Sequence, residues 1–243
     1  MRRWGTAAFH SAFLHILRGR VDQGLSTSGE VFRVGREGDD PQLQGWGRHG
    51  EGLALLCRGE MENAAAALEQ AVTFLSRVPD LYDGCHAVAQ LARCLLMLGK
   101  AERARPLIAE GRRMLSGVGL KGPKVAFAGA ALAECCLLLS EREKGGGRLA
   151  EAGPLVRLSL TAARRFRGAL PEALRVLGTF HHLSGRNIRA KRAWRKGLRA
   201  AEKLGAPWET AWLHRDIGRR TGNAFHLREA ASLLAALGVT MND

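Results

Sequence analysis

A short cassette of residues recurs along this chain at nearly constant spacing, and it constrains the fold more than any other feature. In its three clear copies a glycine is followed five residues later by alanine, at Gly59 and Ala64, Gly99 and Ala104, and Gly185 and Ala190. Weaker copies begin at Gly19 and Gly222, so successive glycines are 40, 40, 86 and 37 residues apart. The longest step hides a degenerate unit around residues 140–152, which includes three consecutive glycines at 145–147. A period near forty residues predicts small structural units that stack on one another.

Side-chain size repeats around the cassette as well. The residue seven positions before the glycine is small, at Ala12, Gly52, Ala92 and Gly178. The residue four positions after the small cassette residue is bulky and apolar, at Leu68, Ile108, Val156 and Trp194. This register predicts two closely packed helices per unit, with each bulky side chain in its neighbour's groove. The glycine is expected to end the first helix, because it adopts the left-handed conformation at low cost.

Helix-start signals complete a prediction of twelve helices in six antiparallel pairs. Asp40 precedes Pro41 as an N-cap would, and Pro123, Pro171 and Pro207 stand where a first-turn proline loses no hydrogen bond. The predicted helices are 4–18, 22–36, 42–57, 62–77, 82–98, 102–116, 123–141, 149–166, 171–184, 187–204, 208–221 and 225–237.

The amino-acid composition favours helices throughout. Hydrophobic residues make up 46% of the chain, most of them alanine and leucine, and there is one tyrosine. Strands are richer in β-branched and aromatic residues, so we predict an all-α fold. No apolar run reaches the roughly 20 residues that cross a membrane. The five cysteines are odd in number, form no Cys-x-x-Cys pair and lie in apolar helical stretches, which predicts a cytoplasmic protein with buried thiols.

The register of small and large residues is clearest at Gly52–Gly59, Ala64, Leu68 and Ala71. It resembles the tetratricopeptide repeat (TPR) superfamily, and it can be followed over residues 92–111 and 178–197, although the units are longer than usual and several family aromatics are missing. The resemblance implies a right-handed solenoid of about six antiparallel helix pairs in a single domain, residues 1–243. The approximate units are 1–41, 42–81, 82–122, 123–170, 171–206 and 207–243.

A narrower resemblance covers the C-terminal part of the chain. Residues 200–211, 217–220 and 226–238 are similar to the ends of repeat arrays in bacterial multidomain regulators that carry ATPase, kinase or cyclase domains. The resemblance implies a regulatory or signalling role in which the array senses a protein or a small ligand. The sequence leaves open whether this chain is a fragment of such a regulator or a stand-alone relative, and it leaves the oligomeric state open.

Residue patterns typical of common catalytic and metal sites are not found in the sequence. The nearest approach to a phosphate-binding loop is Gly117–Gly122, which lacks the required lysine and serine and is interpreted as a loop between units. His181 and His182 are adjacent, and adjacent helix residues point about 100° apart, too far for one shared metal. Asp39 and Asp40 could form an acid pair, but Asp40 is better explained as the cap before Pro41. We therefore expect no catalytic residue, cofactor or metal, and an enzyme hidden in the groove is only a third hypothesis.

Charge is the most unusual property of the chain, which carries a formal net charge of +14. Residues 142–220 contain 19 lysines and arginines against 6 acidic residues. On the predicted helix 187–204, six basic residues fall within an arc of about 120°, while Ala190, Trp194, Gly197, Ala201 and Leu204 form the opposite, packing face. The basic residues, which we name the basic stripe, are Arg189, Arg192, Arg195, Lys196, Arg199 and Lys203. The stripe would bind an acidic protein, nucleic acid or an anionic membrane surface, or would simply face solvent.

The leading hypothesis from the sequence is a non-catalytic scaffold for a protein or peptide partner. In TPR-like arrays the first helix of each pair lines the binding groove. The groove candidates on these helices are Arg48, Glu51, Leu55, Gln90, Arg93, Glu134, His181, Trp212 and Arg215. The alternative is a nucleic-acid-binding regulator that uses the basic face of residues 142–220.

Overall fold

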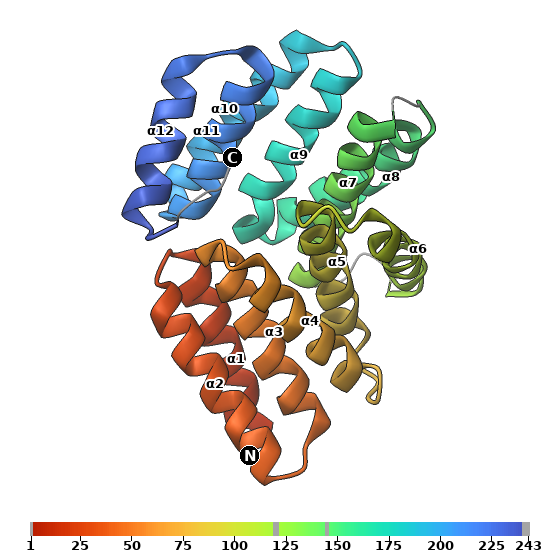
Figure 1. Ribbon diagram of the computed structural model, residues 1–243, viewed down its shortest axis with the longest axis vertical. Helices are drawn as coiled ribbons and strands as arrows, with labels where there is room; N and C mark the ends of the chain where they lie inside the picture. The colour runs from red at the N-terminus through yellow and green to blue at the C-terminus, as the bar shows by residue number, and fades with distance from the viewer. Residues whose placement is uncertain (1, 119–121, 144–145, 240–243) are drawn as a thin grey trace. The chain divides into compact units, whose positions relative to one another are not determined.

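The computed structural model describes residues 2–118, 122–143 and 146–239, and over these residues the chain is all-α (Figure 1). The described residues form twelve α-helices and one short 3-10 helix, Arg167–Ala169. The prediction of an all-α chain with twelve helices is therefore confirmed. Contacts between residues divide the chain into two compact units, Met1–Met114 and Leu115–Asp243. The boundaries of the six repeat units stay a prediction.

Unit 1 is built mainly from contacts between helices that are neighbours in the chain. Its helices are α1 (Arg2–Leu17), α2 (Val21–Glu37), α3 (Pro41–Arg58), α4 (Met61–Leu75), α5 (Leu81–Met97) and α6 (Ala101–Val118), the last of which runs across the division. Each of α1 to α4 packs on the next helix, and α3 also packs on α1 and α5. The first helices of successive pairs therefore contact one another in this unit.

Unit 2 repeats this arrangement. Its helices are α7 (Pro123–Glu143), α8 (Gly146–Arg165), α9 (Leu170–Leu183), α10 (Asn187–Leu204), α11 (Pro207–Thr221) and α12 (Ala224–Ala236). Each helix packs on the next, and α9 also packs on α7 and α11. The first helices again form a contiguous row. Two features that the sequence singled out, the loop 117–122 and the glycines 145–147, lie partly outside the described residues.

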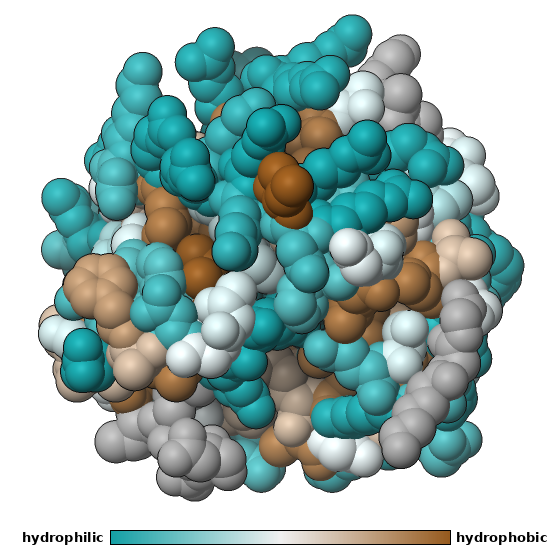
Figure 2. Space-filling model, turned by 90° about the horizontal axis from the view of Figure 1, so that it is seen from above, coloured by the Kyte–Doolittle hydropathy of each residue, from teal (hydrophilic) through white to brown (hydrophobic). Residues whose placement is uncertain are grey.

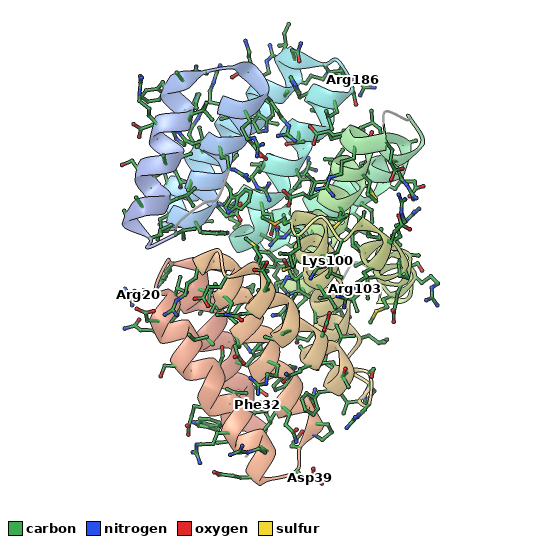
Figure 3. The ribbon with its side chains drawn as sticks, in the orientation of Figure 1. Arg20, Phe32, Asp39, Lys100, Arg103 and Arg186 are labelled. Carbon is green, nitrogen blue, oxygen red and sulfur yellow. The ribbon has the colours of Figure 1, made fainter. Side chains whose placement is uncertain are left out.

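Left-handed glycines end the first helix of most pairs, as the cassette predicts. The cassette glycines all have φ between 67° and 77°, namely Gly19, Gly59, Gly99, Gly185 and Gly222. At four of these turns the following residue donates its backbone N–H to the carbonyl five positions earlier, over 2.8–3.0 Å, which is the Schellman motif. Figure 3 labels three of these donors, Arg20, Lys100 and Arg186. The cassette is therefore a helix–turn–helix signal, and its prediction is confirmed.

The small residues of the register lie where two helices approach most closely. A Cβ atom built on Gly52 would lie 2.6 Å from Cγ of Leu68, and one on Gly178 would lie 2.2 Å from Cδ1 of Trp194. Both bulky partners are fully buried, with Leu68 0% and Trp194 1% exposed. A side chain at either glycine would overlap its partner, so glycine is needed here for close packing.

The two adjacent aspartates before α3 have separate structural roles. Asp40 is the N-cap, and its carboxylate accepts hydrogen bonds from the backbone N–H groups of Gln42 and Leu43 at 2.9 and 3.3 Å. Asp39 occupies the left-handed region with φ of 46° and completes the turn that follows α2. The interpretation of Asp40 as the cap before Pro41 is confirmed.

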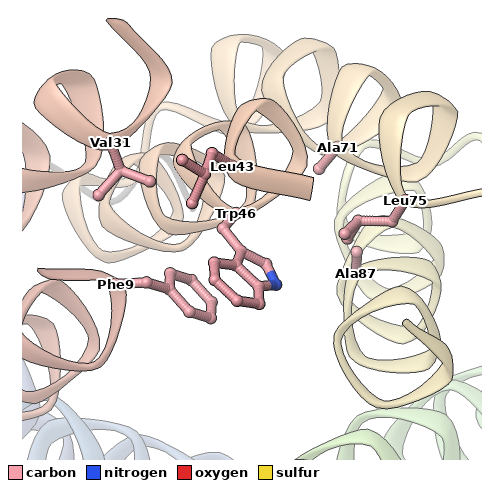
Figure 4. Close-up of a cluster of buried hydrophobic side chains, with 7 residues drawn as sticks. All are labelled: Phe9, Val31, Leu43, Trp46, Ala71, Leu75 and Ala87. Atoms are coloured by element: carbon pink, nitrogen blue, oxygen red, sulfur yellow. The ribbon is translucent and has the colours of Figure 1, made fainter. Parts of the chain in front are cut away.

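Apolar side chains fill the space between the helices of each unit. In unit 1 the ring of Phe9 stacks on the indole of Trp46, with centroids 5.4 Å apart and planes 5° apart (Figure 4). In unit 2, α7 is the one described helix long and apolar enough to cross a membrane, but 78% of its apolar window is buried inside the protein. Such burial is typical of a core helix, because its apolar surface is already covered.

Candidate partner-binding surfaces

A buried arginine joins the first helices of three successive pairs in unit 2. Arg175 on α9 donates two hydrogen bonds to the carboxylate of Glu134 on α7, at 2.6 and 2.9 Å. It donates another to Asp216 on α11 at 3.1 Å, and its Nε atom lies 3.6 Å from Oε2 of Glu209. The Arg175 side chain is only 3% exposed. Because a bidentate arginine–carboxylate pair demands a defined geometry, these contacts position the three helices relative to one another.

The positive and negative charges of this buried network compensate one another. Burial opposes the charge of Arg175, yet the surrounding carboxylates, Glu134 first among them, raise the pKa of Arg175 well above its ordinary value. Arg220 adds a second guanidinium, which lies 3.5 Å from Asp216 and 3.0 Å from Glu141. A buried charge is costly unless it is paired and hydrogen-bonded, so the network persists only because its members compensate one another.

Three of the predicted groove residues meet at this network. Glu134 is a direct partner of Arg175, and the Arg175 guanidinium lies 5.6 Å from the ring centroid of Trp212. Arg215 stacks more closely on the same indole, at 4.6 Å, and burial lowers the pKa of Arg215. Trp212 is 9% exposed, whereas Arg215 is half-buried and accessible. Arg215 is therefore the member of this group best placed to meet a partner.

His181 is the fourth groove candidate in unit 2, and the structure places it apart from the charged network. It lies half-buried on α9, and no described hydrogen bond or ring contact links it to Arg175. Burial lowers the pKa of His181, and the charges of Arg186 and Arg189 act in the same direction. The imidazole is therefore a mainly neutral group at physiological pH.

Unit 1 contains a polar cluster in the corresponding place, between α1, α3 and α5. His49 and His86 are 0% and 1% exposed, and their ring centroids are 4.8 Å apart in an edge-to-face arrangement. Nδ1 of His49 lies 3.6 Å from a carboxylate oxygen of Asp83, and Nε2 of His86 lies 2.9 Å from the amide nitrogen of Gln90. Phe9 packs against His49 with centroids 5.8 Å apart. A polar cluster inside an apolar surround again ties the first helices together.

The predicted groove residues of unit 1 divide into buried and accessible groups. Leu55 and Gln90 are 8% and 2% exposed, so their side chains belong to the interior. Arg48 is accessible, and it pairs with Glu51 at 2.6 Å while its guanidinium lies 3.8 Å above the ring of Phe32 on α2. Arg93 is buried to an intermediate degree on α5. The prediction that these residues bind a partner is not tested by their positions.

The basic stripe of α10 is fully exposed. Its members are Arg189, Arg192, Arg195, Lys196, Arg199 and Lys203, and within the described part of the chain none of them forms an ion pair with an acidic side chain. The packing face of α10 is buried as predicted, except that Leu204 is 40% exposed. The prediction that Leu204 belongs to the packing face was wrong, because Leu204 is the last residue of the helix, where the chain turns at Gly205. Six unpaired cations on one helix form a concentrated positive surface.

A cavity of about 460 Å³ opens beside this stripe, where α10 meets the hairpin of α11 and α12. Its apolar lining comes from Trp194, Leu198 and Ile217, which are buried or half-buried. Lys191 and Arg195, both exposed, contribute the charged part of the lining. The lining of the cavity therefore combines apolar and cationic side chains, which suits an amphiphilic anion.

Two histidines lie close together at the edge of this cavity. Nδ1 of His214 on α11 is 3.2 Å from Nδ1 of His226 on α12, and His226 lines the cavity. Burial lowers the pKa of both imidazoles, and in His214 the charge of His226 adds to the effect. One imidazole must donate and the other accept, so the contact is stable only while at least one of the two is neutral.

Sequence reasoning missed the central residues of both polar clusters, Arg175 and His49. A signal for them exists: Glu134, Arg175 and Asp216 are separated by 41 residues each, which is one repeat period. The position ten residues before the cassette glycine is also equivalent in the five units that carry the cassette, and it holds Phe9, His49, Ala89, Arg175 and Trp212. All five are buried, and they contact one another as the pairs Phe9–His49 and Arg175–Trp212.

Comparison with protein-family profiles and with curated proteins found no match for this chain. Among the described residues, no group of three or more histidine, cysteine or acidic side chains is arranged to hold a metal ion. Each unit has a row of contacting first helices, and unit 2 also carries the basic stripe and its cavity.

Proposed function

We propose that this chain is a non-catalytic, TPR-like scaffold that binds a protein or peptide partner on the row of first helices. Each unit would contribute to a right-handed solenoid, and the partner would lie across successive first helices. The resemblance of the C-terminal part points to a bacterial regulatory or signalling system in the cytoplasm. The proposal requires no cofactor.

The packing of alternate helices is the observation that carries this proposal. In unit 2, α9 contacts both α7 and α11, and in unit 1, α3 contacts both α1 and α5. Stacked repeat arrays present one helix of each pair on a common face, and they bind extended partners there. The polar cluster around Arg175 positions the first helices of unit 2, and the cluster around His49 positions those of unit 1. A rigid row of this kind reduces the entropy that would otherwise be lost on binding.

Arginine and tryptophan at an accessible point of the row support the same proposal. Binding energy at protein interfaces is concentrated in a few residues, and these two types are enriched among them. Arg215 is half-buried and stacks on Trp212 at 4.6 Å, so its guanidinium is already oriented before a partner arrives. In unit 1, Arg48 is oriented similarly above Phe32. These residues are the expected anchors of the partner.

Site-specific photo-crosslinking in the source cells would test the proposal. A photoreactive phenylalanine analogue is placed at Arg215 in one variant and at Arg48 in another, and Arg164, exposed on the second helix α8, serves as the control position. We expect discrete protein adducts from the two first-helix positions, unaffected by nuclease treatment, and none from the control. Equal labelling at all three positions, or the absence of protein adducts at Arg215 and Arg48, would overturn the proposal.

A nucleic-acid-binding regulator is the alternative, and the exposed, unpaired basic stripe favours it. Phosphate binding releases counterions, so the affinity would fall steeply with salt and depend little on nucleotide sequence. Reversing the charge at Arg192, Arg195 and Arg199 would then abolish binding to an oligonucleotide, measured by fluorescence anisotropy at several salt concentrations. If oligonucleotide binding is absent or survives the triple reversal, this alternative fails.

A further inference from the structure

The cavity between α10 and the α11–α12 hairpin has the properties of a second binding site in unit 2. All its lining residues belong to α10, α11, α12 and the turn before α12, which lie together at the end of the chain in Figure 1. Its volume of about 460 Å³ lies within the range of sites that hold small molecules or single side chains. Its largest contribution comes from a second helix, α10, although Ile217 and Thr221 belong to the first helix α11.

The chemistry of the lining selects an anion with an apolar part. Leu198 and Ile217 supply apolar surface beside the buried Trp194, and water inside such a space is readily displaced by an apolar group. The ammonium of Lys191 and the guanidinium of Arg195 stand at the same cavity and are exposed to solvent. A ligand that places an apolar group in the cavity would therefore be bound more tightly if it carries an acidic group next to that apolar group.

The basic stripe continues from the cavity along α10. Arg195 belongs both to the cavity lining and to the stripe. At 100° per residue, Arg192 and Arg199 project within about 60° of Arg195, and the three span about 10 Å along the helix axis. None of them has an acidic partner within the described residues. Figure 2 shows one face of the molecule, on which hydrophilic side chains surround apolar patches.

We propose that this cavity and the adjoining stripe form a docking site for an acidic segment of a partner protein. One apolar side chain of the segment enters the cavity, and carboxylates on either side of it pair with Arg195, Arg192 and Arg199. The apolar anchor provides specificity, and the row of charges provides attraction and orientation.

The shape of the charge distribution favours a peptide over the other anions. A small amphiphilic carboxylate would use the cavity and Arg195 but leave the cations farther along the helix without a role. A single nucleic acid strand would use the cations, but its bases would gain little by stacking in the cavity, because the indole of Trp194 is only 1% exposed. An acidic peptide with one apolar side chain matches both parts of the site. This inference rests on the proposed protein-binding function, but it concerns a different surface.

Fluorescence anisotropy with defined probes would test the site. The first probe is a labelled 13-residue peptide of glutamate and serine with a single central leucine, and the second replaces that leucine with serine. A single-stranded oligothymidine of equal charge is the third. With the full-length protein at about 0.1 M salt we expect the leucine peptide to bind at least about tenfold more tightly than the serine peptide, since one buried leucine contributes this much or more. The oligothymidine should bind more weakly than the leucine peptide.

Three variants separate the contributions of charge and cavity. Arg195→Glu should weaken both peptides about tenfold, because it turns an attraction into a repulsion. Thr221→Phe places a ring at the cavity edge without removing a core residue, and it should abolish the preference for leucine while leaving the serine peptide unchanged. Arg164→Glu, on the exposed face of α8, makes the same charge change as Arg195→Glu and should alter every affinity by less than twofold.

Several results would overturn the inference. These are no measurable binding of the leucine peptide, equal affinity for the two peptides, equal weakening by Arg195→Glu and Arg164→Glu, or oligothymidine binding as tight as that of the leucine peptide. Thermal melting of each variant verifies its fold, and Arg195→Glu decides the matter if Thr221→Phe does not fold. Crosslinking at Arg215 is independent of this site. Adducts there without a leucine preference here would therefore refute the docking site alone, and the reverse pattern would refute the first-helix row alone.

Discussion

Replacing Arg175 by leucine should destabilise the protein strongly. The change removes the guanidinium shared by Glu134, Asp216 and Glu209, whose side chains are 15%, 10% and 13% exposed. Removing one partner from a buried ion-pair network leaves charges in a low-dielectric surround, which costs about 3–5 kcal/mol. The free energy of unfolding should fall by this amount at pH 7, and the melting temperature by about 10 °C.

The pH dependence of this loss distinguishes an electrostatic cause from a packing cause. Without the guanidinium, burial raises the pKa of the neighbouring carboxyl groups in the folded variant above their unfolded values. The folded variant then binds more protons than the unfolded chain at mildly acidic pH, so its stability increases as the pH falls. The difference between wild type and Arg175→Leu should therefore be largest at pH 7 and smaller at pH 5.

Urea unfolding followed by circular dichroism at pH 7 and pH 5 would measure both effects. Arg103→Leu is the matched control, because Arg103 pairs with Glu69 at 2.6 Å but the two side chains are 58% and 43% exposed (Figure 3). An exposed pair contributes about 1 kcal/mol at most, so this variant should stay close to wild type. A loss below about 1 kcal/mol for Arg175→Leu, or an equal loss at both pH values, would refute the reasoning.

Three further predictions concern packing, thiols and histidines. Gly178→Ala should lower the free energy of unfolding by about 1–3 kcal/mol, because its Cβ would lie 2.2 Å from Trp194. Gly29→Ala, whose Cβ would have nothing within 4 Å, should instead stabilise α2 by about 0.5–1 kcal/mol. Thermal melting of the two variants compares these effects, and equal effects would contradict the close approach at Gly178. Burial raises the pKa of Cys85 to about 12 and of Cys94 to about 11. At pH 8 a thiol reagent should therefore label these two cysteines at least about 100-fold more slowly in the native protein than in urea. Fast labelling of either cysteine in the native protein would show that its site opens. Burial lowers the pKa of His214 and His226, so the unfolded chain binds more protons near pH 6 and the stability should fall as the pH drops below about 6.5. In the double variant His214→Gln/His226→Gln this fall should be smaller. Parallel curves of stability against pH for the wild type and the double variant would exclude this pair as the cause of the fall.

Helices and turns were predictable from the sequence because their signals are local. A glycine such as Gly59 ends its helix through its own backbone preference, and the hydrogen bonds of the turn involve residues only a few positions away. Asp40 caps α3 through the next two backbone N–H groups. Close packing was predictable for a different reason. A small residue and a bulky one, such as Gly52 and Leu68, recur at fixed positions in several units, and this pattern indicates that the two helices of a pair approach closely.

The polar clusters could not be predicted in the same way, because their partners are one repeat away and their residues break the local pattern. Arg175 lies within the apolar run Leu174–Leu177, where a charge at helical spacing would be assigned to the surface. Its burial becomes favourable only when Glu134 and Asp216 are brought to it from 41 residues away on each side. The same holds for His49, whose neighbour Asp83 belongs to the next pair of helices. The periodic pattern of the sequence therefore does not predict which buried charged residues are paired with a residue from another helix pair.

The equivalent position in each first helix connects these clusters to function. Ten residues before the cassette glycine, unit 1 has Phe9 and His49 in contact, and unit 2 has Arg175 and Trp212. The position is buried in both units, but an aromatic–imidazole contact and a guanidinium–indole contact cannot replace one another without leaving a buried polar group unsatisfied. Each first helix therefore accepts only its own neighbour. Within each unit, first helices specified in this way have a defined order and spacing, so Arg48 in unit 1 and Arg215 in unit 2 each have a defined setting among their own neighbouring helices.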